Sequence, residues 1–212
     1  NSTGVAEGRY AGRIDEVRVW NVARTEAQIR ENYFGNLTGS EPGLVGLWNF
    51  DDPANPGRDR SAAGHHGKLE GGAKVILQER PGSTAPDASV SDEPLATLVP
   101  VKQRVTNLLR LDGDNGAMMV EALKGFGAGG NQAHTVEAWI RPHGAPQVRS
   151  WPLLLGAPGA GSHHWLLAKD GNLQLGSYNG RQANPPLPPG TWTHLATTWN
   201  PTGRVYTTYL NG

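Results

Sequence analysis

The chain of 212 residues contains no cysteine, which excludes both a disulfide framework and a thiolate zinc site. It also has no excess of either charge, because 19 Lys and Arg balance 19 Asp and Glu. Binding to nucleic acid or to anionic membrane depends on clustered positive charge, so the composition predicts neither partner. No apolar run is long enough to span a bilayer, and we therefore expect no membrane insertion.

Turn-forming residues are abundant instead, with 29 Gly and 16 Pro. Between these turns lie short stretches in which apolar and polar residues alternate, as in half-buried strands. A helix is expected only over residues 26–33, where Thr25 and Gln28 have the spacing of a capping box. These features predict an all-β protein in which two antiparallel sheets pack as a sandwich with one short helix.

Residues 12–20 predict a strand with two different faces. Strict alternation places Arg13, Asp15, Val17 and Val19 on one face and Ile14, Glu16, Arg18 and Trp20 on the other. Asp15 then shares the apolar side with two valines. An ionised carboxylate in that position is costly to desolvate unless it is paired or bound to a metal ion.

Seven segments of the chain share a pattern with known proteins: GRIDEVRVWNVARTEAQI (12–29), LVGLWNFDD (44–52), DRSAAGHHGKL (59–69), LRLDG (109–113), HTVEAWIRP (134–142), GTWTHLATTW (190–199) and YTTYLNG (206–212). Together they resemble the laminin-G-like and pentraxin-like jelly rolls, which belong with the concanavalin A-like lectin and glucanase sandwiches. The resemblance implies a jelly-roll sandwich. It does not fix the function, because this fold carries lectins, adhesion modules, spacers and enzymes.

The order of these segments leaves two domain arrangements open. In similar domains the segment that resembles residues 12–20 closes the sheet, whereas here it comes first. Residues 1–36 are then either the tail of a preceding repeat, or a strand and helix that fold back to complete a sandwich formed by residues 43–212. Residues 79–107 contain four Pro and predict a linker-like insertion. Either arrangement suggests a piece of a longer, repetitive protein.

The sequence does not predict an enzyme. Glucan-cleaving members of this fold resemble one another in a strand of pattern E-x-D-x-E or E-x-D-x-x-E, which brings two catalytic carboxylates together. No such pattern occurs here, since Asp15 and Glu16 are adjacent and alternation sends them to opposite faces. A nucleophile-elbow signature is also absent from the sequence.

Sugar binding needs an aromatic platform beside hydrogen-bonding side chains, and two clusters offer this combination. Glu137, Trp139 and Arg141 share one strand face, but we expect Trp139 to pack in the core together with Trp192 and Trp199. The second cluster is the predicted ligand site. It comprises Trp151, His163, Trp165, Tyr178, Asn179 and Arg181.

A structural calcium ion is predicted at Asp15 and the polar loop 51–66. This loop supplies Asp51, Asp52 and Asp59 among Gly and Pro residues that leave carbonyl oxygens free, and calcium prefers six to eight such oxygen ligands. Similar sandwiches bind calcium where the loop of the first strand meets the closing strand, so the resemblance implies the same residues. The alternatives are an ion pair of Asp15 with an arginine such as Arg58 or Arg60, or a turn cap.

The sequence as a whole predicts a non-catalytic recognition module of an exported or cell-surface multidomain protein. The expected ligand is a glycan or an extracellular protein, and other repeats of the same parent chain are further possible partners. The alternative is a structural spacer or adhesin repeat without a ligand, and a glycan-cleaving enzyme of the same fold comes third.

Overall fold

The computed structural model describes residues 10–82, 102–120, 123–126, 132–144, 150–156, 163–169, 172–177, 180–181 and 187–212. They form thirteen strands and one helix. The elements are β1 (Ala11–Trp20), α1 (Glu26–Asn32), β2 (Leu44–Trp48), β3 (Lys68–Glu70), β4 (Lys74–Gly82), β5 (Lys102–Asp112), β6 (Ala117–Met119), β7 (His134–Pro142), β8 (Ser150–Gly156), β9 (His163–Lys169), β10 (Asn172–Ser177), β11 (Gly180–Arg181), β12 (Thr193–Asn200) and β13 (Val205–Leu210). The described helix is too short to cross a membrane.

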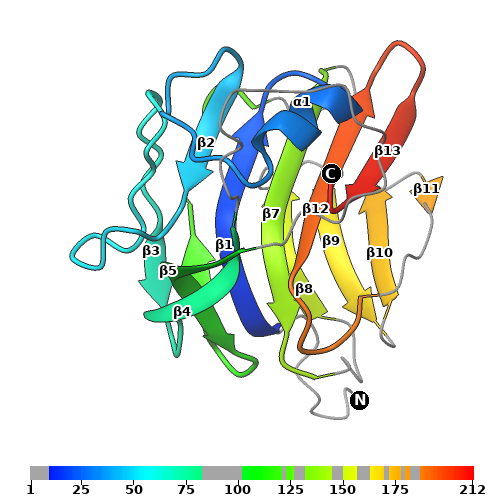
Figure 1. The fold of residues 1–212 in the computed structure, drawn as a ribbon. Coiled ribbons are helices and arrows are strands. Elements are labelled where there is room, and N and C mark those ends of the chain that lie inside the picture. Colours follow the sequence, from blue (N-terminus) through cyan, green and yellow to red (C-terminus); the bar gives the residue numbers. More distant parts are fainter. Residues whose placement is uncertain are drawn as a thin grey trace.

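Two antiparallel sheets form a sandwich (Figure 1). The larger sheet has the strand order β13-β12-β7-β1-β5-β4, with β2 as a further partner of β1. The second sheet has the order β11-β10-β9-β8 and lies behind the first in Figure 1, while β3 and β6 form a separate two-stranded ribbon. The predicted fold class, an all-β sandwich of antiparallel sheets with one short helix, is confirmed for the described residues.

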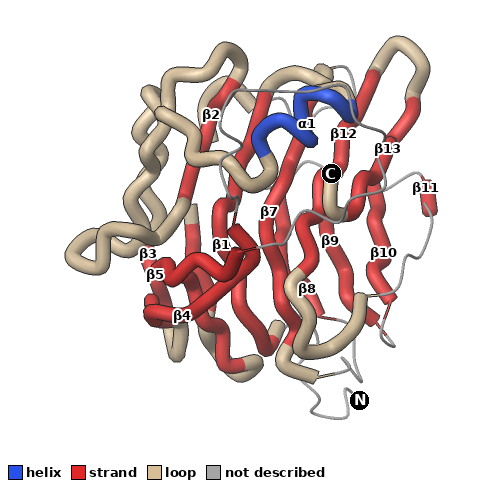
Figure 2. The backbone as a smooth tube through the Cα atoms, in the orientation of Figure 1, coloured by secondary structure: helices blue, strands red, loops and turns tan. Residues whose placement is uncertain are grey.

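β1 lies in the middle of the seven-stranded sheet, although it comes first in the chain (Figure 2). Along one side it pairs with β7 from Gly12 to Trp20. Along the other side its first half pairs with β5 and its second half, from Val17, pairs with β2. Three strands from later parts of the chain therefore depend on β1 for their backbone hydrogen bonds.

A β-bulge in β1 overturns the predicted faces of this strand. Glu16 and Val17 together lie opposite the single Ala138 of β7, and Glu16 has a positive φ of 51°. The extra residue shifts the alternation by one position, so that Ile14 and Val17 both face the apolar core. Asp15 is therefore not on the side of the valines, as strict alternation predicted, but on the opposite face of the sheet.

The apolar core lies on one face of the seven-stranded sheet. Its buried members are Tyr10, Ile14, Val17, Val19, Val45, Trp48, Phe50, Leu109, Leu111, Ala138, Ile140, Leu187 and Leu195. The opposite face, called the outer face below, carries charged and aromatic side chains that are also buried, among them Arg18, Glu137 and Trp139. This second buried layer requires a cover of its own.

Helix α1 and the loop that follows it cover part of the outer face (Figures 1 and 2). The helix begins with the predicted capping box, in which Thr25 and Gln28 each accept the backbone N–H of the other. Ile29 is its fully buried residue. After the helix, the carbonyl of Tyr33 accepts the indole N–H of Trp139 at 2.8 Å, which fixes this segment against β7.

The hairpin of β4 and β5 crosses in front of β1 and covers another part of the outer face (Figure 1). The residues predicted as linker-like begin and end in this hairpin, because residues 79–82 belong to β4 and residues 102–107 to β5. Residues 83–101 lie outside the described residues. Pro81 fits here because β4 is an edge strand, where a missing N–H breaks no interior ladder.

Deleting residues 1–36 would remove β1 and α1 and leave β7, β2 and β5 with an unpaired edge. We expect fragment 37–212 to lose cooperative unfolding, since four core residues and the middle of a sheet are lost together. A synthetic peptide of residues 10–36, added in trans, should restore the native circular dichroism. The same peptide with Val17→Asp and Val19→Asp should fail. If fragment 37–212 unfolded cooperatively at the same midpoint temperature as the full chain, this expectation would be contradicted.

Candidate functional site

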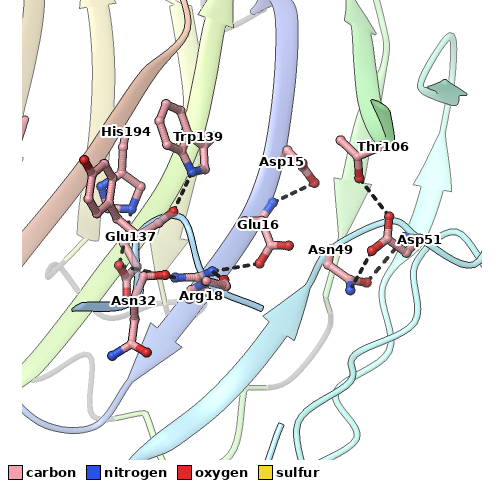
Figure 3. A network of polar contacts seen from close by, with 12 residues as sticks. Asp15, Glu16, Arg18, Asn32, Asn49, Asp51, Thr106, Glu137, Trp139 and His194 are labelled. Carbon is pink, nitrogen blue, oxygen red and sulfur yellow. Dashed lines mark hydrogen bonds and ion pairs between the residues drawn. The ribbon is translucent and has the colours of Figure 1, made fainter. Parts of the chain in front are cut away.

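Seven charged or ionisable side chains form a buried ionic network on the outer face. Its members are Asp15, Glu16, Arg18, Arg24, Arg80, Glu137 and His194. Figure 3 labels Asp15, Glu16, Arg18, Glu137 and His194 among them. β1, β4, β7 and β12 supply six of them, and Arg24 precedes α1. The network therefore joins segments that lie far apart in the sequence.

One half of the ionic network is built around the bulge. The Arg80 side chain donates through Nε to the carboxylate of Asp15, which also accepts the Glu16 N–H at 2.9 Å. Arg18 donates to the Glu16 carboxylate at 2.9 Å, and Arg80 lies 3.4 Å from its other oxygen. Burial raises the pKa of Asp15, as does the charge of Glu16, while Arg80 opposes this shift. The arginine partner of Asp15 is thus Arg80 rather than Arg58 or Arg60.

The other half of the ionic network surrounds Glu137. One carboxylate oxygen accepts the indole N–H of Trp20 at 2.7 Å and the guanidinium of Arg24 at 3.0 Å. The other lies 3.3 Å from His194 Nε2 and 3.9 Å from Arg18. Burial raises the pKa of Glu137, but contact with His194 and the arginine charges outweigh burial and lower the pKa to about 2. Burial also lowers the pKa of His194.

The ionic network is a structural element and not an accessible site. Arg18 donates to the carbonyls of Asn32 and Gly35 at 2.8 and 2.7 Å, so it fastens the end of α1 over the charged groups. Glu137 is 1% exposed, and one of its oxygens accepts from the Trp20 indole and the Arg24 guanidinium, while the other faces His194 at 3.3 Å. These carboxylates therefore lack the open space for substrate and water that glycoside hydrolysis requires.

The predicted cluster of Glu137, Trp139 and Arg141 divides into a covered and an open part. Glu137 and Trp139 lie under the loop after α1, and Trp139 is 2% exposed, as expected for a packing residue. Arg141 shares their strand face but lies beyond the cover, where it lines an open groove. Its Nε donates to the carbonyl of Gly190 at 2.6 Å, which holds the guanidinium at the groove wall.

This groove, called the Trp192 groove below, lies between β4 and the loop that precedes β12. Its lining residues are Leu77, Gln78, Glu79, Pro81, Val105, Arg141, Gly190, Thr191 and Trp192. The indole N–H of Trp192 donates to the Glu79 carbonyl at 3.1 Å, which fixes the ring while leaving it half-buried. The sequence had indicated a core position for Trp192, and nothing in it shows that β4 comes within reach of this ring.

The ligand cluster predicted from the sequence falls mainly in the four-stranded sheet. Trp151 is in β8, His163 and Trp165 are in β9, and Arg181 is in β11. The backbones of Trp165 and Arg181 both pair with Gly176, while His163 pairs with Gly156. The structure describes only the backbone of these four residues, and Tyr178 and Asn179 lie outside the described residues. This cluster stays a prediction.

Asp51 and Asp59, the other predicted calcium ligands, are held by hydrogen-bond donors. Asp51 accepts from the Thr106 hydroxyl at 2.9 Å and from the Asn49 amide at 3.2 Å (Figure 3). Asp59 is buried and accepts three backbone N–H groups and the Ser61 hydroxyl. This carboxylate organises the loop.

The surroundings of Asp15 and Asp59 do not fit the predicted calcium site, which stays a prediction. Asp15 is occupied by Arg80, while Asp59 is surrounded by N–H and O–H donors, which present hydrogens where an ion needs lone pairs. Among the residues that the structure describes, no three His, Asp or Glu side chains gather closely enough to hold a metal ion.

One family model matches the C-terminal part of the chain. Residues 112–212 match the laminin-G family model described as the concanavalin A-like lectin/glucanases superfamily, which confirms the resemblance over this part of the chain. No curated protein and no solved structure matches the sequence. The matched residues include Arg141 and Trp192, whereas β1, α1 and β4 lie outside the match.

Replacing Glu137 with Gln should leave buried Arg24 without its counter-charge and lower the free energy of unfolding by about 3–5 kcal/mol at neutral pH. Because folding lowers the pKa of Glu137, its stabilisation is complete above the unfolded value of about 4.3 and is lost as the pH falls toward about 2. The difference between wild type and variant, measured by urea unfolding, should shrink over that range.

Glu26→Gln is the matched control for this experiment. Glu26 pairs with Arg30 on the exposed surface of α1, where such a pair contributes about 0.3–0.5 kcal/mol. Glu137→Gln could instead lower the free energy of unfolding by an equally small amount, or by an amount that does not change with pH. Either result would show that the network does not stabilise the fold through this carboxylate.

Proposed function

Since residues 112–212 belong to the concanavalin A-like lectin/glucanase superfamily, we propose that this protein is a non-catalytic recognition module that binds carbohydrate in the Trp192 groove. Laminin-G-like domains of this superfamily are in general modules that bind carbohydrate or protein. The fixed, half-buried indole of Trp192 is the observation that carries the choice of carbohydrate.

The indole of Trp192 has the properties of a sugar platform. A sugar ring offers an apolar face that stacks on an aromatic ring, and its hydroxyl groups point outward from the edge. The hydrogen bond from the indole N–H to Glu79 sets the plane of the aromatic ring before any ligand arrives. A platform that is already ordered loses little conformational entropy on binding.

Polar side chains stand around this platform, as hydroxyl recognition requires. Gln78 offers both donors and acceptors, Glu79 offers acceptors, and Arg141 offers donors. The Nε of Arg141 is engaged by Gly190, and its two terminal nitrogens have no hydrogen-bond partner among the described residues. The Trp192 groove therefore combines the groups that a saccharide needs within one open surface.

Two apolar side chains on the same wall also support ligand binding. Leu77 is 69% exposed and Val105 is 58% exposed, and both line the Trp192 groove. Large apolar residues that are exposed side by side mark interaction surfaces more often than scattered ones do. An exported or cell-surface location, which remains part of the proposal, would bring this surface to extracellular glycans.

Trp192→Ala should lower the affinity for a glycan found by array screening about tenfold, corresponding to about 1.4 kcal/mol of stacking. Trp192→Phe should retain most of the affinity, because a phenyl ring still stacks. Both variants should unfold close to the wild-type temperature, since Trp192 is not a member of the apolar core.

Tyr209→Ala is the matched control, because this aromatic residue is also half-buried but lies on β13 outside the groove lining. It should leave glycan affinity unchanged. A folded wild-type protein that binds no glycan on the array would favour a spacer. Reducing-sugar release from β-glucans would contradict the absence of catalysis.

A further inference from the structure

Four basic residues stand side by side across the seven-stranded sheet. Lys74 on β4 pairs with Arg110 on β5, which pairs with Arg13 on β1, which pairs in turn with Arg141 on β7. Directly paired residues of neighbouring strands point to the same face of a sheet. These four residues are called the basic row.

The basic row lies on the outer face of the sheet. The core residues Ile14, Leu109 and Ile140 are each adjacent in sequence to a member of the row and point to the opposite face. Lys74 and Arg110 are exposed, while the two members nearest to the Trp192 groove are half-buried. The row is therefore open to solvent at Lys74 and Arg110 and partly open at Arg13 and Arg141.

This arrangement is unfavourable in the protein alone, because like charges placed directly opposite one another in a sheet repel. Burial lowers the pKa of Arg13, and the charges of Arg141 and Arg110 lower it further. Within the described part of the chain, no carboxylate forms an ion pair with any member of the row. The Nε of Arg13 is shielded from water and has no hydrogen-bond partner there.

The nearest acidic residue along β5 is already engaged. Asp112 follows Arg110 by two positions, and its carboxylate accepts the backbone N–H groups of Asp114 and Gly116 at 2.9 and 3.0 Å. It thereby closes the turn after the strand. Because the whole chain has a net charge of zero, the row is a local separation of charge and not a consequence of a basic composition.

On the basis of the carbohydrate function above, we propose that the glycan is acidic and that its carboxylates bind along the basic row while one of its sugars stacks on Trp192. The row ends at Arg141, which lines the Trp192 groove, so the two features form one continuous surface. Because each member comes from a different strand, and neighbouring strands lie about 4.8 Å apart, the row offers several cations in succession to a polymer that carries several carboxylates.

The composition of the basic row favours carboxylates as the bound groups. Three of its four members are arginines, whose planar guanidinium groups bind carboxylates through two parallel hydrogen bonds. A nucleic acid would be bound by comparable cations, but proteins that bind single strands stack successive bases on several aromatic rings. The described lining of the Trp192 groove contains a single aromatic ring.

The test titrates the full chain with an oligogalacturonate and with its methyl ester, which has the same sugars without the charges. The acid form should bind at least about tenfold more tightly in calorimetry at low salt, and its affinity should fall as salt is added. Arg110→Gln and Lys74→Gln should each weaken the acid form several-fold and leave the ester unchanged. Their unfolding temperatures should not fall, because each removes a repulsion.

Two further variants sharpen the comparison. Glu79→Gln removes the carboxylate that lines the Trp192 groove and should strengthen binding of the acid form. Lys68→Gln is the matched control, because Lys68 is basic and 82% exposed but lies outside the row. It should leave the affinities of both oligomers unchanged.

Each other outcome would overturn the proposal in a recognisable way. Equal binding of acid and ester, unaffected by Arg110→Gln, would leave the carbohydrate function intact and refute the role of the basic row. Binding of sulfated but not carboxylated oligomers would refute the choice of carboxylates. Tighter binding of an oligonucleotide, lost in Arg110→Gln, would assign the row to nucleic acid. Failure of every glycan to bind would refute the proposed function as well.

Discussion

The bulge in β1 is the constraint on which most of the structure depends. Glu16 adopts a left-handed conformation that costs a residue with a side chain about 1–3 kcal/mol, so the surrounding contacts must hold it there. Its effect is to let Ile14 before the bulge and Val17 after it face the same core. A regular strand would send either Ile14 or the two valines to the charged face, because a shift of one residue exchanges the two faces.

The ionic network and the bulge depend on each other. A group of buried charges is costly to desolvate and persists only where nearly every charge meets a partner. The bulge places Asp15 and Glu16 where Arg80 and Arg18 reach them, and the same Arg18 side chain donates to carbonyls just after α1. The conformation of β1, the position of the helix and the crossing of the β4–β5 hairpin are thus fixed through shared side chains.

The features predicted correctly from the sequence are those that depend on local patterns of residues. The sandwich class, the capping box of α1 and the buried position of Trp139 all follow from alternation, spacing and residue type. It could not predict the bulge, since nothing distinguishes Glu16 as a residue with positive φ. It also did not predict that residues 79–82 and 102–107, at the two ends of the linker-like stretch, belong to β4 and β5. The pairing of Asp15 with Arg80 spans 65 positions, and the Trp192 groove likewise depends on where β4 lies.

The outer face of the seven-stranded sheet carries the ionic network in one part and the basic row in another, and burial explains the difference. Under α1 and the β4–β5 hairpin, the buried surroundings have low polarisability, which makes an unpaired charge costly. Arginines and carboxylates therefore occur together there. Beyond these covers, water screens the repulsion among neighbouring cations, and Lys74 and Arg110 can stand together at little cost to folding. A row of this kind becomes favourable when an anion displaces that water. The covered end therefore stabilises the fold, and the open end, beside Trp192, is available for recognition.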